Sequence, residues 1–221
     1  MKPVIKKAVI LTASSMKKEL NGIKHSGTCV TALDVANNRI VRFVTTPDGA
    51  PVEDGYCDYF KPLDVFDNIR IKDSCPLSCQ QENVLPDLSE PDFLSKFRGT
   101  YKGGIEDLYT RYQSIKHDDP SFMLDVSPVL KDISPFQHSL ELIRVESLKV
   151  FVLKPDGGNK ATKCDFRYDG KLYQFYRVTD PDYRLKNVDV GDAYLAVSIP
   201  TEPFDEKGYR KFVAAIFKPA P

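Results

Sequence analysis

Residues 164–178 read CDFRYDGKLYQFYRV, and this stretch decides the fold because Asp169-Gly170 lies between two runs of alternating character. Asp-Gly in that setting is a strong signal for a β-hairpin with a two-residue turn. Such a turn sets a register that ends with Cys164 opposite Phe175. Side chains alternate along each strand, so one face of the hairpin would carry Cys164, Phe166, Tyr168, Lys171, Tyr173, Phe175 and Arg177.

This ring-bearing face has two interpretations. Rings bordered by Lys171 and Arg177 are suited to stacking on nucleic-acid bases, while the cations hold phosphates. Alternatively the rings form the core, because large apolar residues on strands are usually buried. The opposite face, with Arg167, Gln174 and Tyr176, would then be exposed and available for binding. We favour the core, although the sequence does not choose between the faces.

Further strands are predicted on both sides of this hairpin. Asn37-Asn38 is a tight-turn candidate between two of them, which indicates a second hairpin. A change to helical period follows, with a stripe from Ile105 to Ile115 and a shorter one formed by Phe93, Leu94 and Phe97. These stripes predict a pair of short helices. The predicted strands cover residues 8–12, 27–34, 39–44, 62–71, 140–145, 148–153, 193–199 and 212–217.

Prolines set the domain boundary. Pro120, Pro128 and Pro135 interrupt residues 117–138, between two β-rich halves. A chain of 221 residues is long enough for two small β domains. We therefore predict an all-β protein with two consecutive OB-like β-barrels: residues 1–130, with a helical insert near 89–116, and residues 138–221.

Charge and cysteine content limit the function classes. Lys plus Arg number 31 and Asp plus Glu number 31, so a polyanion needs a local basic patch. Lysines and polar residues interrupt every apolar run, which favours a cytoplasmic protein. An odd cysteine count predicts reduced thiols. Cys75 and Cys79 supply only two of the four ligands that structural zinc takes, so no metal and no cofactor are expected.

Several segments, in this order and spacing, resemble the dual OB-containing domain family. In the first half they are Ala8-Val9-Ile10-Leu11-Thr12-Ala13-Ser14-Ser15, Gly27-Thr28-Cys29-Val30 with Asp34, Val41-Arg42 and Gln81-Glu82-Asn83. In the second half they are His138-Ser139-Leu140, Phe166-x-Tyr168-x-Gly170, Val178-Thr179-Asp180-Pro181 and Lys211-Phe212-Val213-Ala214-Ala215-Ile216. The resemblance implies two oligonucleotide-binding-type barrels, and nucleic-acid binding beside bacterial modification and conflict systems. One departure is Ile40, where the family pattern commonly has Trp.

Candidate binding residues are cations and rings near the expected barrel rims. Lys17 and Lys18 lie in the part of the chain where lysines most outnumber acidic residues. A loop in this part would suit the binding of phosphates. The alternative for each candidate is an ordinary role as a solvated surface residue or as an ion-pair partner. The candidates are Lys17, Lys18, Arg42, Arg167, Tyr168, Tyr176, Arg177, Tyr209, Arg210 and Lys211.

The sequence favours a non-catalytic accessory module that binds single-stranded or modified DNA or RNA, with a modification or restriction enzyme as partner. An enzyme acting on a nucleobase or nucleotide is the first alternative, with Cys29, His138 and Asp180 as candidate catalytic residues. A protein–protein adaptor is the second. The sequence contains no P-loop, G-x-G-x-x-G, H-E-x-x-H or deaminase pattern, which lowers the enzyme interpretation.

Overall fold

The computed structural model describes residues 3–20, 23–53, 60–87, 96–115, 117–154 and 158–220, with side chains at all of these except 15–20 and 23–25. The chain divides into two compact units, Met1–Lys116 and His117–Pro221. We had expected the first unit to reach residue 130. The segment 117–130 instead groups with the second unit, where Ser121 and Phe122 donate hydrogen bonds to Glu141.

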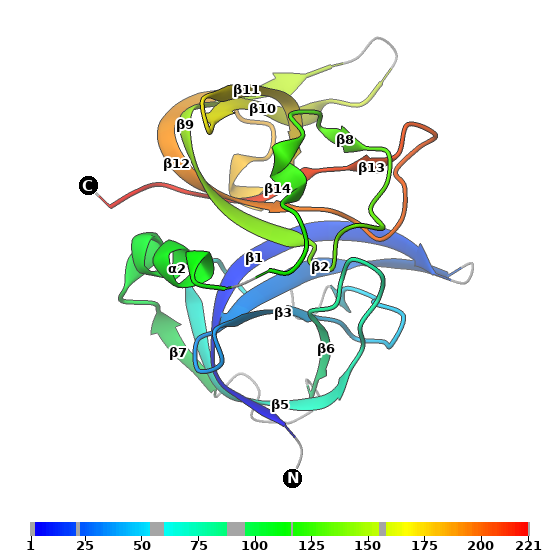
Figure 1. Cartoon of the computed structure of the whole chain (residues 1–221), viewed down its shortest axis with the longest axis vertical. Coiled ribbons are helices and arrows are strands. Elements are labelled where there is room, and N and C mark those ends of the chain that lie inside the picture. The colour runs from blue at the N-terminus through cyan, green and yellow to red at the C-terminus, as the bar shows by residue number, and fades with distance from the viewer. Residues whose placement is uncertain are drawn as a thin grey trace. The chain divides into compact units, whose positions relative to one another are not determined.

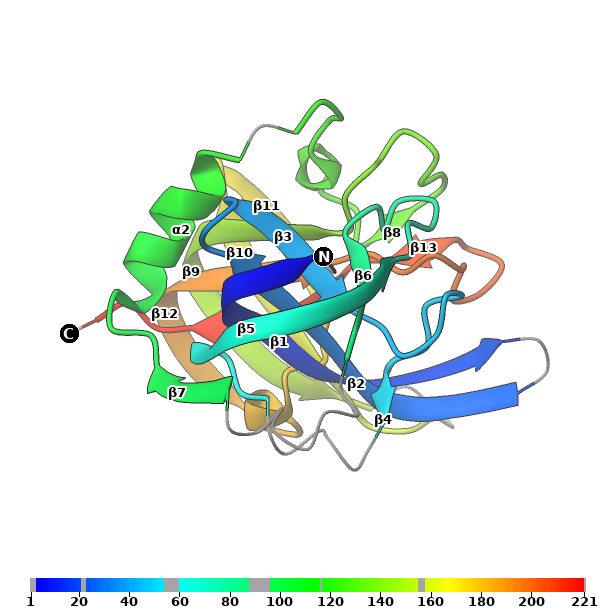
Figure 2. The ribbon, with the colours of Figure 1, turned by 90° about the horizontal axis from the view of Figure 1, so that it is seen from below.

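Unit 1 is a ring of strands. β1 (Val4–Leu20), β2 (Ile23–Asp34), β3 (Arg39–Phe43), β6 (Asn83–Pro86) and β5 (Asp64–Ser74) are neighbours in that order, and β5 pairs back with β1. β3 and β6 are parallel, and the other pairs are antiparallel. β4 (Val52–Glu53) pairs with β2, and β7 (Phe97–Thr100) pairs with β5. Figures 1 and 2 show the ring, and in Figure 2 the far end of the β1–β2 hairpin projects beyond β4.

Local signals explain two elements of unit 1. The predicted β2–β3 hairpin forms, and Asn38 adopts a φ of 48° in its turn. The predicted stripe forms helix α2 (Gly104–Gln113), which buries Ile105, Leu108 and Tyr112. The shorter predicted helix falls largely on residues 88–95, outside the described residues, and its Phe97 lies in strand β7 instead.

Unit 2 is a closed barrel in the order β10-β11-β14-β12-β9. These strands are β9 (Leu140–Leu153), β10 (Ala161–Tyr168), β11 (Lys171–Val178), β12 (Val188–Ser198) and β14 (Phe212–Phe217). β8 (Val129–Leu130) pairs with β13 (Tyr209–Arg210), and two short 3-10 turns, η2 (Phe122–Leu124) and η3 (Pro181–Tyr183), complete the unit (Figure 1). The predicted strands 140–145 and 148–153 are one strand, in which Ser147 has a φ of 54°.

Both units share one connectivity. The first, second, third, fifth and fourth strands of each ring are neighbours, and the third and fifth are parallel. This is the five-stranded Greek-key barrel of an OB-fold. The prediction of a mainly β protein with two OB-like barrels is therefore confirmed.

The core of the second barrel is aromatic. Phe166 and Tyr173 stack with ring centroids 5.2 Å apart, and Tyr176 packs edge-on against Phe166. Both phenol groups are satisfied by backbone carbonyls of the leading segment: Tyr173 donates to Met123, and Tyr176 donates to Val126 and Ser127. Buried hydroxyls need such partners, so these bonds fix residues 123–127 over the core. Within the described residues, no helix has the length and apolar character to cross a membrane.

Candidate nucleic-acid interface

The β10–β11 hairpin changes register in the middle. The predicted pairs hold from Tyr168↔Lys171 to Phe166↔Tyr173, and then a bulge intervenes and Cys164 pairs with Tyr176. The predicted pairing of Cys164 with Phe175 is therefore wrong. A one-residue shift reverses which side of the sheet every later side chain faces. As a result Tyr176 is buried in the barrel, whereas half of the Phe175 side chain is exposed.

Two side chains of β10 hold the bulge in place. Phe175 has a φ of 60°, a left-handed conformation that is costly for a residue with a Cβ. Its backbone N–H donates to Asp165 Oδ1 at 2.7 Å, and its carbonyl accepts from Lys163 Nζ at 3.1 Å. The bulge is thus clamped on both sides. Its effect is to present a ring outward from the middle of a barrel strand.

A second ring faces this region from the segment between β12 and β14, residues 199–211, which we call the 199–211 loop. Phe204 is 52% exposed. The guanidinium carbons of Arg210 and Arg177 lie 4.3 Å and 5.9 Å from its ring centroid. Arg210 also pairs with Asp205, with Nη2 2.7 Å from Oδ2. These contacts join the loop to strand β11 through one ring and two cations.

A pocket of about 200 Å³ lies between the hairpin and the loop. We call it the basic pocket. Among the described residues, Asp205 is the one carboxylate that forms an ion pair with a lysine or arginine side chain of this pocket. Burial lowers the pKa of Lys163, and the nearby charges of Arg210 and Arg177 lower it further. The residues that line the pocket are Pro128, Val129, Lys163, Phe175, Arg177, Lys207, Arg210 and Lys211.

The location agrees with how OB-folds bind. Their ligands lie on the face of the second and third strands and against the loop between the fourth and fifth. In unit 2 those strands are β10 and β11, and that loop is the 199–211 loop. Arg177 and Arg210, both predicted from the sequence, meet there. Tyr209 precedes Arg210 on β13 and is half-buried.

Three predicted binding residues are buried, which corrects those expectations. Tyr176 belongs to the core, as described above. Lys211 is fully buried, donates to the Asp125 carbonyl at 2.6 Å, and has its pKa lowered to about 8 by burial. Arg42 is buried in unit 1 against Glu82 and Cys29. Each of the three is engaged with internal partners, and Lys211 lines the basic pocket with its ammonium group directed to the Asp125 carbonyl.

The other predicted residues lie elsewhere. Arg167 is exposed and Tyr168 is half-buried at the turn end of the hairpin, and neither lines the basic pocket. Lys17 and Lys18 were expected in a loop, but β1 continues through them and pairs them with Ser26 and His25. The side chains of these two lysines lie outside the described residues.

Sequence reasoning missed four members of the site. Lys163 and Lys207 stand in no motif, and Phe175 was placed on the ring-bearing face, for which burial in the core was the favoured interpretation. Phe204 carried a usable signal, because a ring within Pro203, Asp205 and Glu206 has few apolar neighbours in sequence. A ring in a polar loop is a candidate for exposure.

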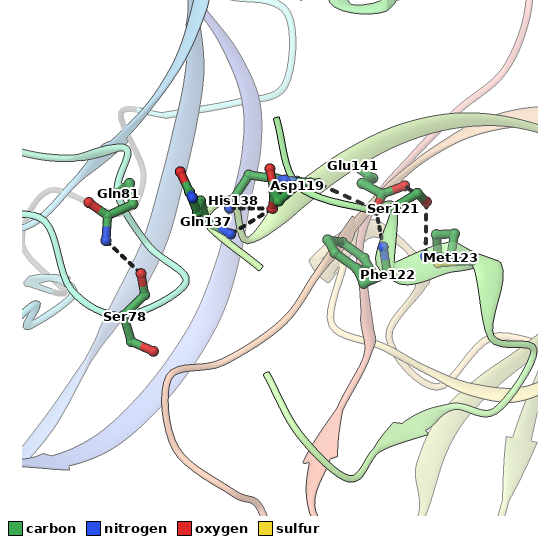
Figure 3. Close-up of polar contacts among 9 residues, drawn as sticks. All are labelled: Ser78, Gln81, Asp119, Ser121, Phe122, Met123, Gln137, His138 and Glu141. Atoms are coloured by element: carbon green, nitrogen blue, oxygen red, sulfur yellow. Dashed lines mark hydrogen bonds and ion pairs between the residues drawn. The ribbon is translucent and has the colours of Figure 1, made fainter. Parts of the chain in front are cut away.

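The candidate catalytic residues do not form a common site in the described contacts. Cys29 is in unit 1, where it contacts Arg42. His138 lies between Asp119 and Glu141 (Figure 3). Asp180 accepts N–H groups from Asp182 and Ile216, and burial raises its pKa to about 6. Each of the three is engaged with its own local partners.

Comparison with known proteins gives one match. A family model described as the dual OB-containing domain matches residues 6–216, nearly the whole chain. No curated protein and no solved structure matches the chain.

Proposed function

Because the chain belongs to the dual OB-containing domain family, we propose that it binds nucleic acid and that its second unit holds a single strand across the basic pocket. OB-folds commonly bind oligonucleotides. The observation that carries the proposal is that cations and two exposed rings gather at the position where OB-folds take their ligand: Lys163, Arg177, Lys207 and Arg210, with Phe175 and Phe204.

The chemistry of the pocket fits a single strand. Phe175 and Phe204 expose ring surface on which bases can stack whatever their sequence, because every base has a π-face. Arg177 and Lys207 supply positive charge for the phosphates between those bases. The chain as a whole is neutral, so this local group must provide the electrostatic attraction.

The charges set the expected salt dependence. If two to three phosphates are neutralised at the pocket, log K falls with log salt with a slope of roughly −1.4 to −2, at about −0.7 per phosphate for single strands. Binding should therefore be measurable at low salt and weaken moderately as salt rises.

The test is fluorescence anisotropy with labelled DNA and RNA oligonucleotides of the same sequence, of roughly a dozen nucleotides. The double variant Arg177→Gln/Lys207→Gln should bind at least tenfold more weakly than the wild type. Arg144→Gln/Lys218→Gln is the matched control, because it removes one exposed arginine and one exposed lysine that do not line the basic pocket. Equal losses in both variants, or no wild-type binding at low salt, would contradict the proposal.

We also propose that the protein acts as an accessory module of a bacterial nucleic-acid modification or defence system and has no catalysis of its own. The family resemblance supports this role, as does the engagement of Cys29, His138 and Asp180 with separate partners. The test is the activity of a modification or restriction enzyme encoded beside this chain, assayed on single-stranded or modified substrate. Addition of the wild-type protein should raise that activity, and addition of Arg177→Gln/Lys207→Gln should not.

A further inference from the structure

Three potential metal ligands meet near the start of unit 2. His117 and Asp119 lie in its leading segment, and His138 lies two residues before β9. One donor atom from each lies within 4.8 Å of the other two. The rings of His117 and His138 are close neighbours, with centroids 4.1 Å apart and planes inclined by 31°. Residues some twenty positions apart in sequence thus converge on one point.

The contact between His138 and Asp119 is unusual. Nδ1 of His138 is 2.7 Å from Asp119 Oδ2, yet this buried nitrogen has no hydrogen-bond partner. The distance is that of an ion pair or hydrogen bond, so the two groups can share one proton or one cation between them. A metal ion bound there would take the place of that proton, with Nδ1 of His138 and the carboxylate of Asp119 as ligands.

A carboxylate supports His138 from its other side. Glu141 Oε1 lies 3.4 Å from Nε2 of His138 (Figure 3). Glu141 is itself fixed, because it accepts from Ser121 Oγ at 2.7 Å and from Phe122 N at 2.6 Å. Metal-binding histidines almost always donate their second ring N–H to such a partner, which sets the tautomer and leaves the first nitrogen free to coordinate.

Asp119 is held in a similar way. Its Oδ2 accepts the backbone N–H groups of Gln137 at 2.6 Å and of His138 at 3.3 Å (Figure 3). These bonds tie the carboxylate to the segment that carries the histidine. Two of the three ligands are thus oriented by the surrounding protein, as a metal site requires.

We propose that His117, Asp119 and His138 bind a divalent transition metal of the zinc type. Two imidazoles and one carboxylate form a ligand set that zinc uses, with a fourth position open to water or another ligand. Mg²⁺ and Ca²⁺ prefer oxygen ligands and suit this set poorly. Bond lengths of about 2.0–2.2 Å place the donors of a tetrahedral zinc site roughly 3.4 Å apart. Small side-chain adjustments reach that spacing from the geometry described above.

The metal would join the leading segment of unit 2 to the residues before β9. That segment also supplies the carbonyls that bind Tyr173 and Tyr176, so the metal would stabilise the barrel. The sequence predicted no metal, because Cys75 and Cys79 lack two further ligands and because positions 117, 119 and 138 come together only in the folded chain.

The test is calorimetric titration of the chelator-treated full chain with Zn²⁺. One ion should bind per chain, and His117→Ala should weaken the affinity at least tenfold. Asp119→Asn is a second variant that keeps one acceptor oxygen for the backbone, and it should also weaken binding at least tenfold. His25→Ala is the matched control, since it removes a histidine outside the cluster and should bind as the wild type does. Circular dichroism checks that each variant folds.

Co²⁺ distinguishes this site from the cysteines. Its absorption spectrum should show d–d bands of a nitrogen and oxygen site without a thiolate charge-transfer band, and His117→Ala should lose those bands. A thiolate band, an unchanged affinity in His117→Ala, or no saturable Zn²⁺ binding by the wild type would overturn the proposal. Oligonucleotide binding by the Zn²⁺-free protein is a separate measurement, so failure of the metal site leaves the proposed function intact.

Discussion

Replacement of Phe175 by glycine and by alanine separates the backbone of the β11 bulge from its ring. Both variants remove the stacking surface, but only glycine adopts a φ of 60° without steric cost. We therefore expect both variants to lose oligonucleotide affinity and glycine to be the more stable of the two. This order is the reverse of the usual one within a strand, where glycine is less favourable than alanine.

The magnitudes follow from exposure and conformation. A phenylalanine buries about 150–250 Å² when fully covered, and Phe175 is 50% exposed. Removal of its covered half therefore costs about 2–3 kcal/mol, at roughly 25 cal/mol per Å². The left-handed conformation costs a residue with a Cβ about 1–2 kcal/mol, and the extra unfolded-state entropy of glycine offsets about 0.5–1 kcal/mol. Phe175→Gly should thus be more stable than Phe175→Ala by roughly 1 kcal/mol.

Two assays are needed. Urea unfolding gives the stability order, and anisotropy gives the binding loss, which should be about 1–3 kcal/mol in both variants. That loss corresponds to roughly 5- to 150-fold in affinity. Leu172 is the matched control, because it lies on the same strand, is 47% exposed and has no positive φ. Leu172→Ala should be more stable than Leu172→Gly, and both should bind normally.

Either of two results would refute this reasoning. If Phe175→Ala is at least as stable as Phe175→Gly, the bulge does not hold a left-handed residue, and the outward direction of the ring loses its basis. If both variants bind as tightly as the wild type, Phe175 does not stack on bases, whatever its backbone conformation.

Three further outcomes are expected. Because burial lowers the pKa of Lys211 from 10.5 to about 8, the unfolded state holds its proton to higher pH, and stability should rise by about 3 kcal/mol as pH increases from 8 to 10.5. Urea unfolding across that range should show the rise in the wild type and not in Lys211→Met. Gly27→Ala should lose about 2 kcal/mol of stability, since a Cβ there would lie 2.1 Å from the Val52 carbonyl oxygen; an unchanged urea midpoint would disprove this contact. In Arg177→Gln/Lys207→Gln, the slope of log K against log salt should become shallower by about 1.4, and an unchanged slope would mean that neither cation contacts phosphate.

The sequence by itself determined the fold to a large extent. Asp169-Gly170 set the hairpin register as far as Phe166 and Tyr173, because a two-residue turn leaves no freedom in the first pairs. The helical stripe from Ile105 and the hairpin at Asn38 were also readable, since each depends on residues close in sequence. The order of strands and the family resemblance then led to two OB-like barrels.

Only the tertiary structure decided the site. Alternation along β11 predicts Phe175 on the same face as Phe166 and Tyr173, and the bulge that separates it from them depends on Asp165 and Lys163 across the hairpin. Lys207 lines the pocket and Phe204 lies beside Arg177 because the 199–211 loop packs against β11. The cluster of His117, Asp119 and His138 likewise depends on where the leading segment packs. Residue patterns within one segment specify strands and turns. A binding site depends instead on contacts between segments far apart in sequence, and the pattern within a segment carries no information about those contacts.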